Sequence, residues 1–379
     1  MQAILDGLAA DLAGRKSDDL HRELELPQGI DFASNDYLGL STHPQFRPRL
    51  LEALASGPLA APSSRLVRGH TSAHAALERR LAAFKGTEAA LLFGTGYQAN
   101  TGLLGALLSP ADRVLSDALN HASLIDGMRL ARAEKVIFPH LDVAAVEREL
   151  LRPWPGGVTY LVTESLFSME GDRAPLDAYA DLTRRYGAGL LVDDAHAVGV
   201  HGVERGSGLT ETFGVARRVL ACVSTFGKGL GLFGAFVAGP RVVMETLINQ
   251  ARPLIFSTAV PPLLLAAISV CLDLLEAEPD RRRRVLALAE RLRQRLAAAD
   301  LVCLGSQSAI VPVLLGANHR ALQVARAVRQ KGFDVRAIRP ETVPPGTARI
   351  RISVHADHSE DQIDALAAAL QAAVRRYRS

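Results

Sequence analysis

The stretch VTYLVTESLFSMEGDRAPLDAYADLTRRYGAGLLVD, residues 158–193, indicates the fold of this chain. Two short apolar runs, at 158–163 and 189–193, flank a segment at 176–186 that has the periodicity of an amphipathic helix. Each run is continuous rather than alternating, which is typical of strands that are buried on both faces of a parallel sheet. The stretch therefore predicts a strand–helix–strand unit of an α/β protein.

The same alternation continues along the chain on either side of this unit. Further apolar runs lie at 89–93, 112–116, 135–138 and 219–223, and helix-like segments lie at 71–84, 97–108, 123–132 and 143–151. Strands that alternate with helices predict a mostly parallel sheet with helices on both faces. Ligands of such sheets bind beyond the carboxyl ends of the strands, so we look for the functional site there.

We expect three parts in the chain. Residues 1–45 would form an N-terminal arm, with a helix at 3–25 because leucines recur there at helical spacing. Residues 46–278 would form a large domain around the parallel sheet. Residues 279–379 would form a smaller α+β domain of ordinary size, with a long helix at 282–299 and a terminal helix from position 360.

Composition excludes several classes of protein. The chain has 379 residues, of which 48% are hydrophobic and 22% charged, as in an ordinary globular protein, and the net charge is only +3. No basic stripe with interleaved aromatic residues suggests a nucleic-acid partner, and no apolar run is long enough to span a membrane. The cysteines (Cys222, Cys271 and Cys303) are few, far apart and without metal-ligand spacing, so we expect a cytoplasmic protein without a metal site.

Lys228 lies in an unusual setting for a lysine. Its surroundings, Cys222-Val-Ser-Thr-Phe-Gly-Lys228-Gly-Leu-Gly-Leu-Phe-Gly-Ala-Phe-Val237, are apolar and glycine-rich, and they follow a predicted strand directly. Desolvation penalises an ammonium ion, so a lysine in such a place can act as a nucleophilic amine. The alternative is a lysine in an ordinary glycine-rich loop.

The sequence Val192-Asp193-Asp194-Ala195-His196 ends the most apolar of the predicted strands. A carboxylate at this point can keep a pyridine nitrogen protonated, and an imidazole three residues later can hydrogen-bond a neighbouring phenolic oxygen. The alternative is that one of the aspartates simply caps the following turn.

Other strand ends carry candidates that are ambiguous one at a time. Gly96 and Tyr97 open a helix, and the free amides of a helix N-terminus suit a phosphate, although a connecting turn is the alternative. His121 can stack on an aromatic ring, and Ser168 can donate a hydrogen bond, yet either side chain can also be structural. Thr225, shortly before Lys228, can bind a phosphate.

Taken together, these features match one cofactor. They supply a phosphate cradle, a histidine for the ring face, an aspartate for a pyridine nitrogen, a histidine for a phenolic oxygen and a lysine for an aldehyde. The sequence therefore predicts pyridoxal 5′-phosphate.

The chain also resembles the α-oxoamine synthases, a family of fold-type I pyridoxal-phosphate enzymes. The resemblance rests on motifs that run in order along nearly the whole chain: Asn35-Asp-Tyr-Leu-Gly, Ser64-Arg-Leu-Val-Arg-Gly, Gly96-Tyr-Gln-Ala-Asn, His121-Ala-Ser-Leu-Ile-Asp-Gly, Phe167-Ser-Met-Glu-Gly-Asp, Asp193-Asp-Ala-His, Thr225-Phe-Gly-Lys-Gly and Ser257-Thr-Ala-Val-Pro-Pro. The segment 337–352 most resembles the family member that condenses L-alanine with a pimeloyl thioester, and so implies an acyltransferase that uses these substrates.

The resemblance also implies roles for individual residues. Lys228 would bind the aldehyde of the cofactor, Asp193 the pyridine nitrogen and His196 the phenolic oxygen, and His121 would stack on the ring. Further cofactor contacts would come from Gly96, Tyr97, Ser168 and Thr225, and from Ser257 and Thr258 across the interface of a homodimer with shared active sites. The substrates would meet His121, Arg22, Asn35, Thr342 and Arg351, the last of which would pair with the carboxylate of the amino acid.

Some alternatives stay open at this point. Ala197 stands where the family usually has glycine, and Glu341 where it usually has proline. Another α-oxoamine synthase, such as 2-amino-3-ketobutyrate CoA ligase, a fold-type I aminotransferase, or a non-catalytic cofactor-binding module would share much of the pattern.

Overall fold

The computed structural model describes residues 1–377 of the chain and divides them into two compact units. One unit comprises residues 35–168 and 173–284, and we call it the large unit. The other comprises residues 1–34, 169–172 and 285–377, and we call it the small unit. Each unit is described by itself below.

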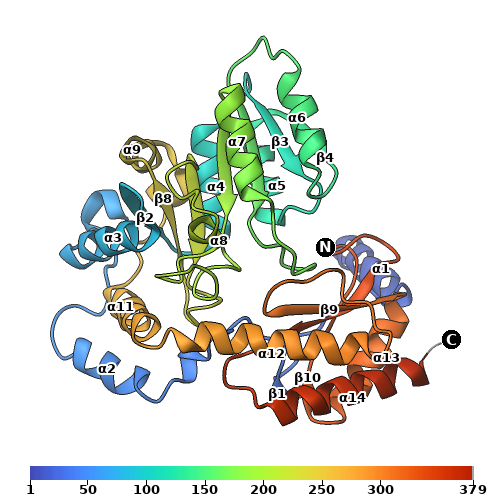
Figure 1. Cartoon of the computed structure of the whole chain (residues 1–379). Coiled ribbons are helices and arrows are strands. Elements are labelled where there is room, and N and C mark those ends of the chain that lie inside the picture. The colour runs from blue at the N-terminus through green and yellow to red at the C-terminus, as the bar shows by residue number, and fades with distance from the viewer. Residues whose placement is uncertain (378–379) are drawn as a thin grey trace. The chain divides into compact units, whose positions relative to one another are not determined.

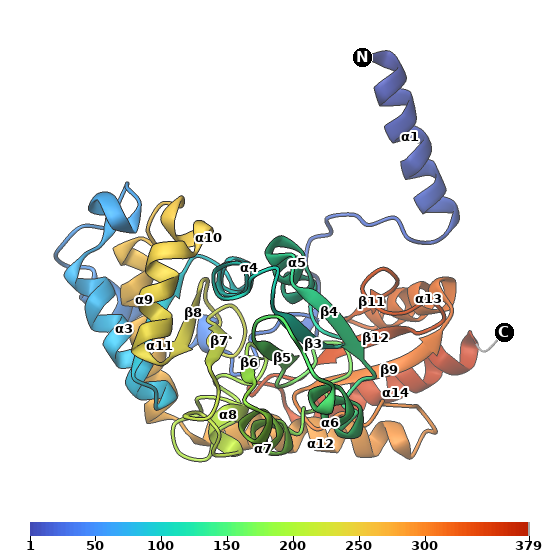
Figure 2. The ribbon, with the colours of Figure 1, turned by 90° about the horizontal axis from the view of Figure 1, so that it is seen from above.

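The large unit is built on a seven-stranded sheet with the strand order β2-β8-β7-β6-β5-β3-β4. Figure 1 labels its edge strands β2 and β4, and Figure 2 labels the central strands β7, β6 and β5. All neighbouring strands are parallel except at β8, which is antiparallel to β2 and β7. The strands are β2 (Ala89–Phe93), β3 (Arg113–Asp117), β4 (Glu134–Phe138), β5 (Thr159–Glu164), β6 (Gly189–Asp193), β7 (Ala221–Thr225) and β8 (Ala235–Gly239).

Helices cover both faces of this sheet. Figure 2 shows α4 and α5 on one face and α6 and α7 on the other. The helices of the large unit are α2 (Phe46–Ala53), α3 (Ser72–Lys85), α4 (Gly96–Leu107), α5 (Ala122–Ala131), α6 (Val143–Leu151), α7 (Leu176–Tyr186), α8 (Leu209–Thr212), α9 (Arg241–Gln250), α10 (Arg252–Ile255) and α11 (Pro262–Ala277), with short η1 (Leu40–Thr42) and η2 (Arg65–Gly69) turns. Strand side chains such as Val162, Leu191 and Val223 pack with Leu103 and Leu104 of α4 in one apolar core.

The small unit holds two short sheets and its own helices. Strands β9 (Ile310–Gly316), β11 (Arg336–Ile338) and β12 (Ala348–Ser353) form an antiparallel sheet in the order β11-β12-β9, and β1 (Ile30–Asp31) pairs with β10 (Phe333–Asp334) in parallel. Its helices are α1 (Gln2–Ser17), α13 (Asn318–Arg329) and α14 (Glu360–Arg376), while α12 (Asp280–Ala297) begins in the large unit and continues into the small one. In residues 1–377 no helix is both long enough and apolar enough to cross a bilayer.

The predicted α/β class and mostly parallel sheet are confirmed, and apart from the N-terminal helix the predicted strands and helices agree with the structure to within a few residues. The prediction of one helix at 3–25 was wrong, because α1 ends at Ser17. Asp19 adopts a left-handed φ of 56°, and the Arg339 guanidinium donates to the carbonyl oxygens of Asp19 and His21, so the chain after Ser17 is held in an irregular form. Strand β8 and the helices α2, α8, α9, α10 and α11 were not predicted at all.

Candidate active site

A cavity of about 270 Å³ opens in the large unit at the carboxyl ends of its central strands. Several predicted residues line it together, although they come from separate parts of the sequence: Asn35, Gly96, Tyr97, His121, Asp193, Thr225 and Lys228. They meet because parallel strands bring all of their carboxyl ends to one edge of the sheet. The motifs that were ambiguous singly therefore share one site.

Asp193 is the last residue of β6 and is nearly buried. Its Oδ2 accepts a hydrogen bond of 2.6 Å from the side-chain amide of Asn100 on α4, and its Oδ1 accepts one of 2.9 Å from the backbone N–H of Ala195. Asp193 thus caps the turn and lines the cavity at the same time. The two hydrogen bonds fix the orientation of the carboxyl group.

His121 is the N-cap residue of α5, and its imidazole lines the cavity. Its Nδ1 lies 2.8 Å from Oγ of Ser123 and accepts a hydrogen bond of 3.2 Å from the Ser123 backbone N–H. Burial lowers the pKa of His121, with the charge of Asp193 opposing that effect and the charge of Lys228 adding to it. A neutral ring with a fixed plane can stack on a flat ligand.

Lys228 lies in the loop between β7 and β8, at residues 226–234, and reaches the cavity wall, where it is partly exposed. Its carbonyl oxygen accepts a hydrogen bond of 2.8 Å from Gly231, which has a left-handed φ of 65°. The turn therefore presents the amine beside the polar groups of the neighbouring strand ends. This placement gives Lys228 the access that a nucleophile needs.

The N-terminus of α4 forms the predicted anion cradle. Thr95 caps the helix by accepting a hydrogen bond of 3.1 Å from the Gln98 N–H. Gly96 and Tyr97, in the first turn of the helix, line the cavity. A Cβ atom on Gly96 would come within 2.6 Å of Thr225 Cγ2. Thr225 Oγ1 is buried and has no hydrogen-bond partner among the described residues, so it can bind a ligand oxygen. These observations fit a phosphate group.

His196 is buried in the turn after β6 and is connected to the cavity through Tyr37. The Tyr37 hydroxyl lies 2.8 Å from Nδ1 of His196 and donates a hydrogen bond of 3.1 Å to Oδ1 of Asn35, which lines the cavity. This connection fixes the plane of the imidazole.

Other predicted residues lie outside the cavity wall. Ser168 is buried after β5, and Ser257 and Thr258 line a separate small cavity of the large unit together with Gly94 and Gln98. Arg22, Thr342 and Arg351 belong to the small unit. There Arg22 and Thr342 line a cavity of about 430 Å³, and the Arg351 guanidinium on β12 donates a hydrogen bond of 3.0 Å to Ser353 Oγ.

The sequence reasoning missed Asn100, Ser123 and Tyr37 as parts of the site. Asn100 stands one helical turn after Gly96, so it lies on the same face of α4, and this spacing was the available signal. Ser123 and Tyr37 stand two residues after His121 and Asn35, within motifs that had already been noted. Their contacts depend on side-chain directions that spacing alone does not give.

Comparison with known proteins places the chain among enzymes. Residues 27–370 match the sequence profile of a family described as aminotransferase class I and II. An 8-amino-7-oxononanoate synthase from Anaeromyxobacter dehalogenans is 45% identical over 97% of this chain and 95% of its own length. The synthase of that name from Geobacter sulfurreducens is 46% identical over 89% of this chain and 86% of its own length.

Solved structures agree with these relatives. A serine palmitoyltransferase from S. paucimobilis, with pyridoxal phosphate and myriocin bound, has a TM-score of 0.91 at 29% identity and covers 100% of this chain and 99% of its own. An 8-amino-7-oxononanoate synthase from Francisella tularensis has a TM-score of 0.79 at 27% identity and covers 93% of this chain and 99% of its own. The fold similarity therefore extends over both units of the chain.

Proposed function

The chain belongs to the class I and II aminotransferase family, within its 8-amino-7-oxononanoate synthase branch, and on that premise we propose that it condenses L-alanine with a pimeloyl thioester. The reaction releases the thiol and carbon dioxide and gives 8-amino-7-oxononanoate, a step of biotin biosynthesis. The chain is a pyridoxal-phosphate-dependent acyltransferase. The single observation that supports the proposal most is the convergence of Lys228, Asp193 and His121 on one cavity.

The residues around that cavity fit pyridoxal phosphate. The amides at the start of α4 and the unpartnered Thr225 hydroxyl would hold the phosphate, Asp193 the pyridine nitrogen, and His121 the ring face. His196 would hold the phenolic oxygen, and Ser168 would lie close to the ring. Ser257 and Thr258 would reach the phosphate in the partner's site of a homodimer. The bound cofactor supplies an electrophilic aldehyde and a protonated ring that withdraws electrons from the α-carbon of the amino acid.

The side chains would then divide the remaining tasks. Lys228 Nζ would bind the aldehyde carbon, take the proton from the α-carbon of L-alanine once the substrate amine has displaced it, and later return a proton. Asp193, held by Asn100, would keep the positive charge on the ring nitrogen. Arg351 would pair with the carboxylate of the amino acid, and Asn35 would contact the substrate.

The acyl donor carries phosphate groups, whether the thiol belongs to coenzyme A or to a carrier protein. The cavity of about 430 Å³ in the small unit supports such a donor, because it is lined by the basic residues Lys16, His21, Arg22, Arg326, Arg329, Arg336 and Arg339. Burial lowers the pKa of Arg339, and the charge of nearby Arg22 lowers it further, while the charge of Asp19, which also lines the cavity, opposes both effects. Glu25 neutralises part of this charge by pairing with Arg329 and Arg336.

A cytoplasmic homodimer is part of the proposal. Two thiols of the large unit, Cys222 and Cys271, are buried and free, and burial raises the pKa of each to about 12. Unreactive free thiols suit a reducing compartment.

A thiol-release assay tests the function. L-alanine, glycine and L-serine are each paired with pimeloyl-, acetyl- and palmitoyl-CoA and with a pimeloyl carrier protein, and thiol and carbon dioxide are measured. We expect L-alanine with a pimeloyl thioester to give the highest kcat/KM, with one carbon dioxide for each thiol.

Other outcomes of the same assay separate the alternatives. A preference for glycine and acetyl-CoA would indicate a 2-amino-3-ketobutyrate CoA ligase, and amino-group exchange without thiol release would indicate an aminotransferase. Serine with palmitoyl-CoA would match the first structural neighbour, but 45% identity to the synthases against 29% to that enzyme favours alanine.

A further inference from the structure

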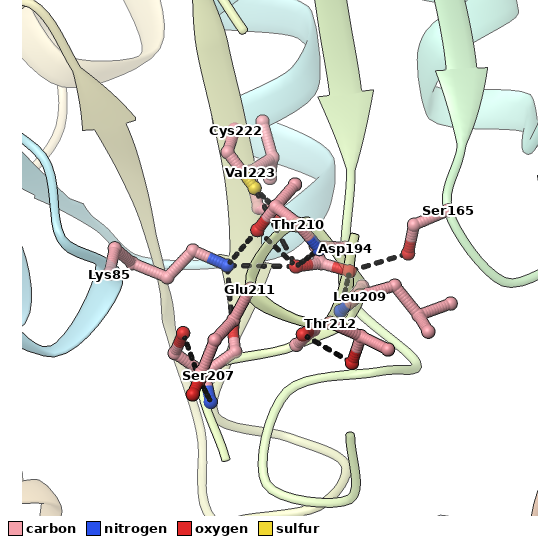
Figure 3. Close-up of polar contacts among 12 residues, drawn as sticks. Lys85, Ser165, Asp194, Ser207, Leu209, Thr210, Glu211, Thr212, Cys222 and Val223 are labelled. Carbon is pink, nitrogen blue, oxygen red and sulfur yellow. Dashed lines mark hydrogen bonds and ion pairs between the residues drawn. The ribbon is translucent and has the colours of Figure 1, made fainter. Parts of the chain in front are cut away.

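A completely buried ion pair lies at the end of strand β6, beside the candidate site. Lys85, the last residue of α3, and Asp194, the residue after β6, are both 0% exposed, and Lys85 Nζ lies 2.8 Å from Asp194 Oδ2 (Figure 3). Of the five lysines in the chain, Lys85 is the one whose side chain is fully enclosed. No task described above uses it.

Each polar atom of this pair has several partners. The Lys85 ammonium donates to Asp194 Oδ2, to the Ser207 carbonyl oxygen at 2.5 Å and to Thr210 Oγ1 at 3.1 Å, which uses all three of its protons. Asp194 Oδ1 accepts from the Ser165 hydroxyl at 2.5 Å and from the Leu209 N–H at 3.1 Å. Its Oδ2 also accepts from the Thr210 hydroxyl at 3.0 Å.

The cluster therefore ties together four separate segments. It joins the end of α3, the residue after β5, the turn after β6 and the loop that leads into α8. The packing is close, since a Cβ atom on Gly208 would lie 2.1 Å from Asp194 Oδ2. Figure 3 shows Lys85, Ser165 and Thr210 approaching Asp194 from different directions.

Both members of the pair are charged. Burial lowers the pKa of Lys85, but its interactions with Asp194 and Cys222, the charge of Asp194 first among them, together outweigh that effect and raise the pKa above its ordinary value. Burial raises the pKa of Asp194, but Lys85 and the hydrogen bonds outweigh it and lower that pKa. The nearby Cys222 thiol and His201 ring carry no charge at neutral pH, because burial raises the pKa of Cys222 to about 12 and lowers that of His201 to about 3.

The pair acts on the same turn that carries the cofactor residues. Asp193 and Asp194 are consecutive, and consecutive side chains along a strand point to opposite faces. Asp193 therefore meets Asn100 and the cavity while Asp194 meets Lys85. The Asp194 carbonyl oxygen also accepts from the N–H groups of Ala197 and Val198, so this residue fixes the turn that contains His196.

We propose that Lys85 is a positioning residue of the cofactor site, which compensates the charge of Asp194 and thereby sets both the geometry of the turn and the charge around Asp193. The proposal rests on the cofactor role of Asp193 given under the proposed function. Stability alone is a poor reason for such a pair, since well-packed apolar residues often replace a buried ion pair at no cost in stability. Without Lys85, two adjacent carboxylates would share one end of a strand with no cation on the Asp194 side.

The test measures the visible absorption of the bound cofactor as a function of pH in the full-length, cofactor-loaded protein. In Lys85→Met, Asp194 keeps its donors from Ser165, Leu209 and Thr210 and stays ionised. Its uncompensated negative charge then raises the pH midpoint of the absorption change. In Asp194→Asn, the stranded ammonium lowers the midpoint. Each shift is on the order of one pH unit for a unit charge several ångströms away. The double variant Lys85→Met/Asp194→Asn carries no net change in charge and returns towards the wild-type midpoint.

A control variant separates this effect from a loss of stability. Arg80 lies on the same helix and pairs with Asp273 and Glu276 of α11, so Arg80→Met removes a cation from α3 away from the cavity. We expect its cofactor midpoint and its Kd for pyridoxal phosphate to match the wild type, whatever happens to its Tm. The Lys85→Met variant should bind the cofactor at least tenfold more weakly.

The results decide the proposal in each case. Wild-type midpoints in Lys85→Met and Asp194→Asn, with only a lower Tm, would overturn it and leave the pair a purely structural one. If Lys85→Met does not fold, Asp194→Asn and the double variant decide by the same comparison of midpoints. A wild-type protein that shows no cofactor band would instead contradict the proposed function, so the two failures are distinguishable.

Discussion

Asp193 and Asp194 have the same side chain and adjacent positions, yet the structure gives them different surroundings. Asp193 meets Asn100 at the cavity, and Asp194 meets Lys85 in the interior. The alternation of side chains along a strand is the reason, because it sends neighbours to opposite faces. The sequence reasoning noted both aspartates, and only the sheet determines which of them lines the cavity.

Lys228→Ala should abolish turnover and remove the visible absorption band of bound pyridoxal phosphate, because no other amine lines the cavity among residues 1–377. The measurements are the thiol-release rate and an absorption spectrum after cofactor addition. Lys135→Ala, which removes an exposed lysine on β4, should leave both unchanged. An active Lys228→Ala protein would rule out this lysine as the nucleophile.

Asn100→Ala should weaken cofactor binding about tenfold or more, since a hydrogen bond to a charged group contributes about 1.5–3 kcal/mol. The variant removes the 2.6 Å hydrogen bond to Asp193 Oδ2 and the 2.8 Å hydrogen bond to Ser123 Oγ. The Kd is obtained by titrating the protein with pyridoxal phosphate. The matched control is Asn249→Ala, whose amide is exposed on α9 and donates to the Glu245 carbonyl oxygen.

At the scale of elements, the ends of helices and strands were predicted well where local chemistry defines them. Thr71 caps α3 and Gly86 ends it with a left-handed φ of 71°, which agrees with the helix predicted at 71–84. Helix α1 was predicted too long because leucine spacing continues past Ser17, and α1 itself has no buried residue. Periodicity therefore shows which residues could share a helical face, and only contacts with the rest of the unit decide where that helix stops.

Ser359→Ala should lower the free energy of unfolding by about 1 kcal/mol, the usual cost of losing an N-cap. Ser359 Oγ accepts a hydrogen bond of 3.1 Å from Gln362 N–H at the start of α14, and the Gln362 side chain accepts in return from the Ser359 backbone. Urea denaturation of the cofactor-free protein measures the change. Ser56→Ala, at an exposed coil position, serves as the control and should have no effect.

At the scale of the whole molecule, buried histidines link stability to pH. Burial lowers the pKa of His201 to about 3, and burial together with neighbouring charges lowers the pKa of His74 and His358 to about 4. The unfolded chain binds protons at these side chains near the ordinary pKa of 6.5, which the folded chain cannot do. Their contribution to stability is therefore complete above pH 6.5 and is lost as the pH falls from there towards 4 and below.

We expect the Tm of the cofactor-free protein to fall as the pH is lowered from 7 to 5. His201→Leu should make that fall less steep, because leucine does not titrate in either state. The change corresponds to at most about one proton fewer taken up on unfolding. The comparison concerns the slope of Tm against pH, so a constant loss of stability in the variant does not affect it. An unchanged slope would mean that His201 is protonated in the folded protein.

The sequence by itself determined the mostly parallel α/β sheet, the alternation of its parallel strands with helices along the chain, and the residue types for a pyridoxal-phosphate site. These follow from local properties: apolar runs, helical spacing, caps, and polar residues after strands. The tertiary structure alone decided the insertion of β8, the end of α1, the link from His196 through Tyr37 to Asn35, and the burial of Lys85 against Asp194. Each of these depends on contacts between segments far apart in sequence, which spacing along the chain does not encode.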